Sequence, residues 1–220
     1  MRAAFHDELE AITATLVEMG DLVALAMREG TTALLTADLK LAEKVIADDD
    51  RIDAMQHQLE ADAIDLMTRQ QPVAQDLRTL VTSLRMSADL ERMGDFGHHI
   101  ARIARMRYPA TAVPPELTAT IQAMGDVAGL IINKATHVIR TQDLKASVEL
   151  EDDDDAMDRL HRQLFTILLD DAWSHGIETA IDMTLLGRYY ERCADHAVST
   201  ARRVYFLVKG EYASEQKSGA

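Results

Sequence analysis

Two pairs of acidic residues recur at matched positions and could bind a metal ion. Glu91 and Asp95 form the pattern Glu-x-x-x-Asp, which returns 100 residues later as Glu191 and Asp195. Like charges four residues apart repel on a helix, so a chain that repeats such a pair invites a chemical explanation. Carboxylate oxygens at this density suit hard or borderline cations such as Mg, Mn or Fe.

A second acidic pair precedes each of these patterns. Asp49 and Asp53 are also four residues apart, and they recur as Asp154 and Asp158. If adjacent antiparallel helices carry the pairs, four carboxylates in each half come together and repel strongly unless a cation or a basic partner joins them. The candidate metal ligands are therefore eight: Asp49, Asp53, Glu91, Asp95, Asp154, Asp158, Glu191 and Asp195.

The same acids could instead be ordinary solvated residues, since acidic pairs on helices usually are. Arg92 and Arg192 stand beside the acids in the sequence and could neutralise them. His98 and His161 each follow a candidate aspartate by three residues, and we interpret both as surface histidines, with an accessory ligand role open to His98. The residues alone leave metal binding and simple solvation as alternatives.

The acidic pairs belong to a longer internal repeat, which is the first feature to seek in a chain of this kind. Met19-Gly20-Asp21 recurs as Met124-Gly125-Asp126, and the segment 36–40 recurs as 141–145, each 105 residues later. Because the Glu-x-x-x-Asp pattern is displaced by only 100, the first half carries five extra residues, which we place in the proline-containing segment 69–75. We infer that the chain is a duplication.

Each half is predicted to contain three helices. Apolar residues step by three and four from Phe5 to Met27, which is typical of an amphipathic helix. Asp38 and Asp143 suit N-caps of the second helix of each half, and Pro72 suits the start of the third. The remaining helices are expected to end near 69 and 107 and to span 116–140, 143–173 and 178–208. Such units pack as antiparallel bundles, so the predicted fold is all-α.

The third helix of each half carries an apolar stripe beside its acidic pair. The carboxylates sit about 120° around the helix from the stripe, so we expect them outside the core. Cys193 lies on the stripe and is interpreted as a buried structural thiol. Small residues at Gly97 and Ala197 would let a neighbouring helix approach closely. The predicted stripes are Met86, Leu90, Met93, Gly97, Ile100 and Ala104, and Leu186, Tyr190, Cys193, Ala197, Ala201, Val204 and Val208.

Composition excludes several classes of protein. The formal net charge of −14 makes direct binding to nucleic acid unfavourable. A single cysteine permits no internal disulfide and fits a reducing, cytoplasmic setting. No uncharged run approaches the roughly 18 residues of a membrane span, so we expect no direct membrane insertion.

The order of these motifs resembles the PhoU family of bacterial phosphate-uptake regulators, with QPVAQDLR (Gln71 to Arg78) and the paired Glu-Arg-x-x-Asp motifs as the specific elements. The resemblance implies two tandem three-helix bundles related by a pseudo-twofold axis, here 1–108 and 109–210, followed by a polar tail, 211–220. It implies a non-enzymatic, cytoplasmic homodimer that acts between the ATPase of the phosphate ABC transporter and the phosphate-sensing histidine kinase. Such a protein would restrain phosphate uptake and the phosphate-starvation response.

The resemblance also implies metal clusters on the Glu-x-x-x-Asp motifs, with Fe, Mn, Mg or Zn as the candidate ions. One alternative is a ferritin-like di-metal protein with redox activity, which needs Glu-x-x-His motifs that this sequence lacks. Another is a direct phosphate sensor, which would need an arginine cluster or a phosphate-binding loop. Arg102 and Arg202 are matched between the halves, and we expect them to support the acids.

Overall fold

The chain is seen in a computed structural model that describes residues 2–211, with side chains from residue 5 onward. That range contains six long helices and no β-strand. The all-α prediction is therefore confirmed. The predicted tail, 211–220, lies outside the described residues except for Glu211. The helices are α1 (Arg2–Thr36), α2 (Leu39–Gln70), α3 (Gln75–Arg107), α4 (Thr118–Thr141), α5 (Leu144–Leu168) and α6 (Gly176–Lys209), with a short 3-10 helix η1 (Pro115–Leu117) before α4.

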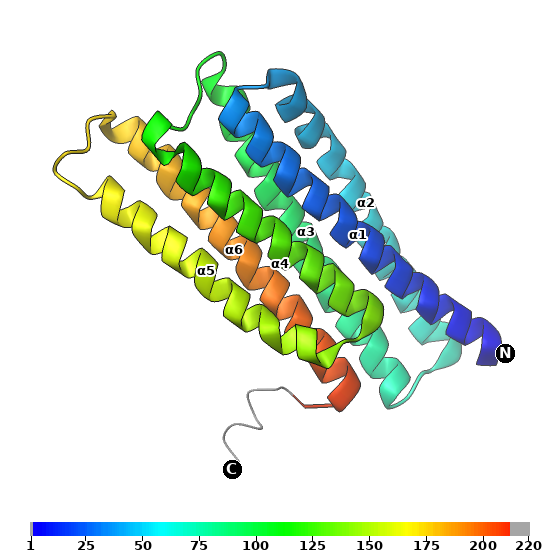
Figure 1. Cartoon of the computed structure of the whole chain (residues 1–220). Coiled ribbons are helices and arrows are strands. Elements are labelled where there is room, and N and C mark those ends of the chain that lie inside the picture. Colours follow the sequence, from blue (N-terminus) through cyan, green and yellow to red (C-terminus); the bar gives the residue numbers. More distant parts are fainter. Residues whose placement is uncertain (1, 212–220) are drawn as a thin grey trace, which may run out of the picture.

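The helices form two three-helix bundles placed side by side. Helices α1, α2 and α3 pack on one another, as do α4, α5 and α6. The bundles meet where α1 packs on α4 and α3 packs on α6, so α2 and α5 lie at opposite outer edges (Figure 1). One continuous apolar core runs through both halves.

The predicted apolar stripes form this core. Leu16, Met19 and Met27 of α1 are fully buried, as are Leu90 and Met93 of α3. The exceptions lie at helix ends, where fewer neighbours cover the side chain: Phe5 is half-buried and Val208 is exposed. Burial of these large apolar side chains supplies the main free energy that holds the bundles together.

Helix boundaries follow the predicted caps in most places. The side chain of Asp38 accepts a hydrogen bond from the backbone N–H of Leu41, and that of Asp143 accepts from Lys145 and Ala146. Two boundaries differ from the prediction. Helix α3 begins three residues after Pro72, and α5 ends at Leu168, five residues before Trp173, because the chain turns through two exposed aspartates.

The duplication of the sequence is visible in two equivalent contacts between α1 and α4. Gly20 lies against the side chain of Thr136, where an added Cβ would sit 2.3 Å from its hydroxyl oxygen, and Gly125 lies against Thr31 in the same way, at 2.9 Å. Each glycine and each threonine is 105 residues from its counterpart. The repeated Met-Gly-Asp motif therefore contributes a packing glycine that lets α1 and α4 approach closely. The hydroxyl groups of Thr31 and Tyr190 hydrogen-bond at 2.8 Å and tie α1 to α6.

The contact between α3 and α6 is antiparallel and includes two charged contacts. Near the middle of α3, buried Asp89 accepts a hydrogen bond from Nε of Arg203 at 2.7 Å and contacts Nδ1 of His196 at 3.0 Å, both in the second half of α6. At the C-terminal end of α3, Nε of Arg107 donates to buried Asp182 at 2.6 Å. Tyr189 stands at the position that matches Asp89, so the contact of Asp89 with Arg203 and His196 is not repeated in the other half.

Candidate metal sites

The first group of predicted acids lies between α2 and α3. Burial raises the pKa of Asp49, and the charges of Asp53 and Asp95 raise it further, while His98 opposes the shift. Burial also raises the pKa of Glu91, with contributions from Asp95, Asp53 and Asp49, opposed by Arg92. Mutual repulsion of this kind requires the four carboxylates to lie near one another. We call Asp49, Asp53, Glu91 and Asp95 the first acidic cluster.

The second group lies between α5 and α6 in the same arrangement. Burial raises the pKa of Asp154 to about 6, and the charges of Asp195, Asp158 and Glu191 add to that shift. We call Asp154, Asp158, Glu191 and Asp195 the second acidic cluster. The structure thus groups the eight predicted residues by half, each time from the middle two turns of a pair of antiparallel helices.

Asp49 is buried, which differs from the expectation that the acids lie at the exterior. Its residue surface is only 9% exposed, whereas Asp195, in the second cluster, is exposed. Gly94 explains part of this burial: a Cβ there would sit 3.0 Å from Cδ1 of Ile52 and 3.4 Å from Oδ1 of Asp49. The glycine lets α2 come close to α3, whereas Ala194 stands at the matched position in α6.

The two candidate histidines are less exposed than predicted. Nδ1 of His98 lies 2.6 Å from Oδ2 of Asp49, so His98 belongs to the first acidic cluster. His161 is half-buried against Gly187, and its Nε2 is buried without a hydrogen-bond partner among the described residues. Neither position is that of a freely solvated side chain. The accessory ligand role considered for His98 is compatible with its contact to Asp49.

Basic side chains partly neutralise both clusters. Arg92 pairs with Asp95 at 3.1 Å and approaches Glu91 at 3.8 Å, as its neighbouring position suggested. In the second half this role falls to Arg188, whose NH1 nitrogen lies 2.5 Å from Glu191. Arg192 does not pair with the acids; its guanidinium lies over the ring of Phe96, 5.3 Å from the centroid. The sequence could not distinguish these destinations, since they depend on how α3 packs on α6.

The chemistry of the donor set fits a metal ion, although the side chains are not preassembled around one. Between residues 5 and 211, no three His, Cys, Asp or Glu side chains converge as they would around a single bound ion. Three of the carboxylates contact other groups instead: Asp95 pairs with Arg92, Glu191 with Arg188 and Asp49 with His98. A cation bound there would stabilise the buried carboxylate charge of Asp154 and relieve its repulsion by the neighbouring acids, both of which raise its pKa.

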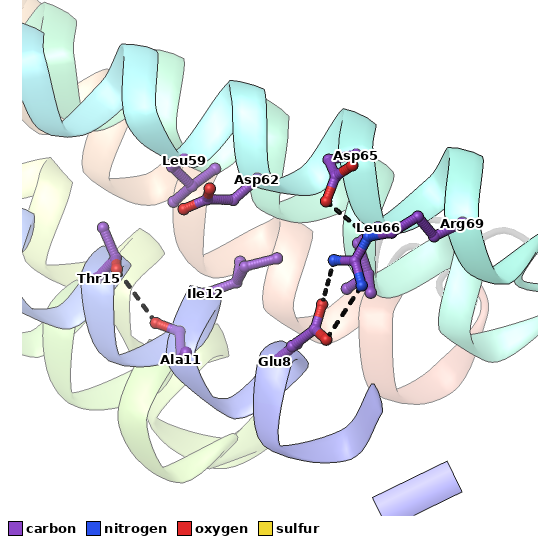
Figure 2. Close-up of a pocket in the computed structure, with 9 residues that line it drawn as sticks. All are labelled: Glu8, Ala11, Ile12, Thr15, Leu59, Asp62, Asp65, Leu66 and Arg69. Atoms are coloured by element: carbon purple, nitrogen blue, oxygen red, sulfur yellow. Dashed lines mark hydrogen bonds and ion pairs between the residues drawn. The ribbon is translucent and has the colours of Figure 1, made fainter. Parts of the chain in front are cut away.

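A hollow between α1 and α2 lies away from the acidic clusters. It measures about 190 Å³, and Glu8, Asp65 and Arg69 are among the residues that line it (Figure 2). The guanidinium of Arg69 donates to Asp65 and to Glu8, both at 2.7 Å, which bridges the two helices. Since the acids are already paired with Arg69, this hollow is best explained as part of the packing between the ends of α1 and α2.

The architecture defines a class: a duplicated three-helix protein with an acidic cluster in each half. The family model described as PhoU domain matches residues 16–104 and 121–204, one match in each half. The chain therefore belongs to the PhoU family, as its motifs predicted.

Curated relatives share most of the chain. The "Phosphate-specific transport system accessory protein PhoU homolog 2" of Mycobacterium tuberculosis is 45% identical over 212 residues, covering 96% of this chain and 100% of that protein. The corresponding homolog 1 from the same species is 42% identical over 217 residues, covering 99% and 98%. A homolog from Rhizobium meliloti is 28% identical over 94% of this chain and 88% of its own.

Solved structures share the fold. The crystal structure of PhoU from Pseudomonas aeruginosa superposes with a TM-score of 0.85 at 28% identity, covering 94% of this chain and all of that one. The phosphate transport system regulatory protein PhoU from Streptococcus pneumoniae has a TM-score of 0.80 at 22% identity, covering 95% and 99%. Both support two tandem three-helix bundles as the fold of this chain.

Proposed function

We propose that this protein is an accessory protein of a phosphate transport system and a negative regulator of phosphate uptake and of the phosphate-starvation response. The observation that carries the proposal is the pair of acidic clusters at matched positions in the two halves of a PhoU fold. The names of the mycobacterial relatives, which align over nearly the whole chain, support the accessory role in phosphate transport.

The protein acts as a cytoplasmic, non-enzymatic homodimer that links the ATPase subunit of the phosphate ABC transporter to the phosphate-sensing histidine kinase. Its net charge of −14 favours association with basic patches on such partners. Within residues 2–211, no helix has both the length and the apolar character needed to cross a membrane.

Metal ions bound by the two acidic clusters set which surfaces are available for docking. The ligands are drawn from the eight predicted acids, with His98 as an accessory group in the first cluster, and the ion is Fe, Mn, Mg or Zn. A metal-free cluster carries several negative charges and repels acidic partner surfaces, whereas each bound divalent ion cancels two of those charges. Metal occupancy would thereby alter which partners can bind.

The partners are tested by affinity capture of a tagged protein from the source cell at high and at low phosphate. The proposal predicts that the transporter ATPase and the histidine kinase are captured, in proportions that change with phosphate. A Glu91→Ala, Asp95→Ala variant that is folded but lacks metal should capture less of at least one partner. Capture of neither partner in either condition would contradict the adaptor role.

A further inference from the structure

A basic hollow lies on the surface where α3 meets α6, next to the first acidic cluster: the ring of His99, which lines the hollow, lies 5.7 Å from that of His98. It measures about 520 Å³ and is lined by His99, Arg102, Ile103, Arg105, Met106 and Tyr189. His99, Arg102 and Arg105 follow one another at intervals of three along α3, so their side chains lie on one stripe of the helix. The ring of Tyr189, from α6, lies 5.2 Å from that of His99 and forms the opposite wall.

Among the described residues, the two arginines of this hollow have no acidic partner, although the chain is strongly acidic overall. Across residues 5–211, neither Arg102 nor Arg105 forms an ion pair or hydrogen bond through its side chain, and both residues are exposed. Arg202, the counterpart of Arg102, donates to Glu151 at 2.8 Å. The residue of α2 that corresponds to Glu151 is Ile46, so the first half supplies no equivalent acid.

The matched position on the other side of the contact between α3 and α6 holds a carboxylate. There the counterpart of Tyr189 is Asp89, which is bound by Arg203 and His196. A carboxylate between an arginine and a histidine is therefore a stable arrangement in this architecture. Beside Tyr189, the positions that match Arg203 and His196 hold Ile103 and Phe96. The positive groups there are instead Arg102 and Arg105, and neither pairs with an acid among residues 5–211.

We propose that the hollow lined by His99, Arg102, Arg105 and Tyr189 is a binding site for a phosphate-class oxyanion, either inorganic phosphate or a phosphomonoester. Guanidinium groups match the geometry of phosphate oxygens and form charge-assisted hydrogen bonds with them. Two arginines supply more positive charge than a single carboxylate needs, which favours a divalent anion. Ile103, Met106 and Tyr189 offer an apolar wall against which the organic part of a phosphomonoester can lie.

The site is tested by calorimetric titration of metal-free, chelator-treated protein with inorganic phosphate and with phenyl phosphate at constant ionic strength. The wild type is expected to bind at one site. An Arg102→Gln, Arg105→Gln variant should bind roughly ten-fold more weakly or worse, because charge-assisted hydrogen bonds are lost. An Arg85→Gln variant is the matched control, since Arg85 is an exposed arginine of α3 outside the hollow, and its affinity should stay within about two-fold of wild type.

The titrations distinguish free phosphate from a phosphomonoester as the ligand, and they also test whether the site exists. Phenyl phosphate bound more tightly than inorganic phosphate identifies a phosphomonoester; equal or weaker binding identifies free phosphate. Binding of neither anion by the wild type, or equal weakening by the Arg85 control, would overturn the site. Because metal is absent and no partner is used, this failure would leave the proposed adaptor and metal functions untouched.

Discussion

Nδ1 of His98 lies 2.6 Å from Oδ2 of Asp49, and this contact joins α3 to α2 within the first acidic cluster. Val198 stands at the matched position in α6, so the second cluster has no equivalent histidine. The two clusters are therefore chemically unequal despite their shared origin. A group that orients a ligand carboxylate strengthens metal binding without itself touching the ion.

Replacing His98 is expected to weaken metal binding in the first cluster alone. In a Glu191→Ala, Asp195→Ala background, which leaves only the first cluster, His98→Ala should lower affinity about 10- to 100-fold. The matched control is Val198→Ala in a Glu91→Ala, Asp95→Ala background, where affinity should not change. Competition with a fluorescent chelator measures both, and equal effects at the two positions would refute the role of His98.

Asp154 predicts a pH-dependent stability in the metal-free protein. Its pKa is raised to about 6 from the usual value near 4, so folding takes up a proton between those pH values. The contribution of Asp154 to the free energy of unfolding consequently falls as the pH rises through that window. Above pH 6 this contribution is fully lost. Asp154→Asn should raise the free energy of unfolding at pH 7 by about 1 kcal/mol, allowing for solvent screening, and by much less at pH 4.

Urea unfolding of the chelator-treated protein at the two pH values measures this effect. Asp152→Asn is the control, because Asp152 is an exposed acid on the same helix that does not contribute to the raised pKa of Asp154. A gain from Asp154→Asn that is as large at pH 4 as at pH 7 would show that the cost of holding a buried, repelled charge at Asp154 is not its cause.

The glycine contact between α1 and α4 predicts a destabilising mutation with a specific rescue. Gly20→Ala would place a Cβ 2.3 Å from the hydroxyl of Thr136, so it should lower the free energy of unfolding by about 1–3 kcal/mol. Removing the obstructing atoms with Thr136→Ala should restore part of that loss in the double variant. Gly129→Ala is the control: nothing lies within 4 Å, and it should stabilise helix α4 by up to about 1 kcal/mol.

Thermal or urea unfolding of the four proteins gives the coupling between Gly20 and Thr136. If Gly20 and Thr136 are in direct contact, the double variant should lose less free energy of unfolding than the sum of the losses in the two single variants. Strict additivity would contradict direct contact between these positions.

Cys193 should be inert in the folded protein. It is completely buried, and burial raises the pKa of its thiol, so the reactive thiolate is scarce. A thiol reagent such as Ellman's reagent should modify Cys193 only in denaturant, and bound metal should not alter that result. Rapid modification under native conditions would mean that the contact between α6 and its neighbours opens.

The sequence predicted those features that local patterns determine. The spacing of Leu16, Met19 and Met27 identified one buried face of α1. Asp38 was recognisable as an N-cap because capping is a local interaction, here between the Asp38 side chain and the first turn of α2. The grouping of Asp154 with Asp195 was anticipated as one of two alternatives, because adjacent antiparallel helices can bring repeated i, i+4 pairs together or leave them in solvent.

Features that depend on the register between helices were not predictable. The contact of His98 with Asp49 requires α2 to be aligned on α3, and Arg192 turns to Phe96 only because α6 packs beside α3. The interaction of Asp89 with Arg203 has no counterpart in the repeat, so self-similarity could not reveal it. The early end of α5 was missed because apolar spacing continues through Leu168 and Leu169 into the turn.

Metal content of purified variants tests the central claim most directly. Elemental analysis of the wild type, of each paired variant (Glu91→Ala with Asp95→Ala, and Glu191→Ala with Asp195→Ala) and of the quadruple variant should be combined with circular dichroism to verify folding. We predict that each paired variant loses the metal of its own half and that the quadruple variant retains none while staying helical. A folded quadruple variant with the same metal content as the wild type would contradict the assignment of both acidic clusters.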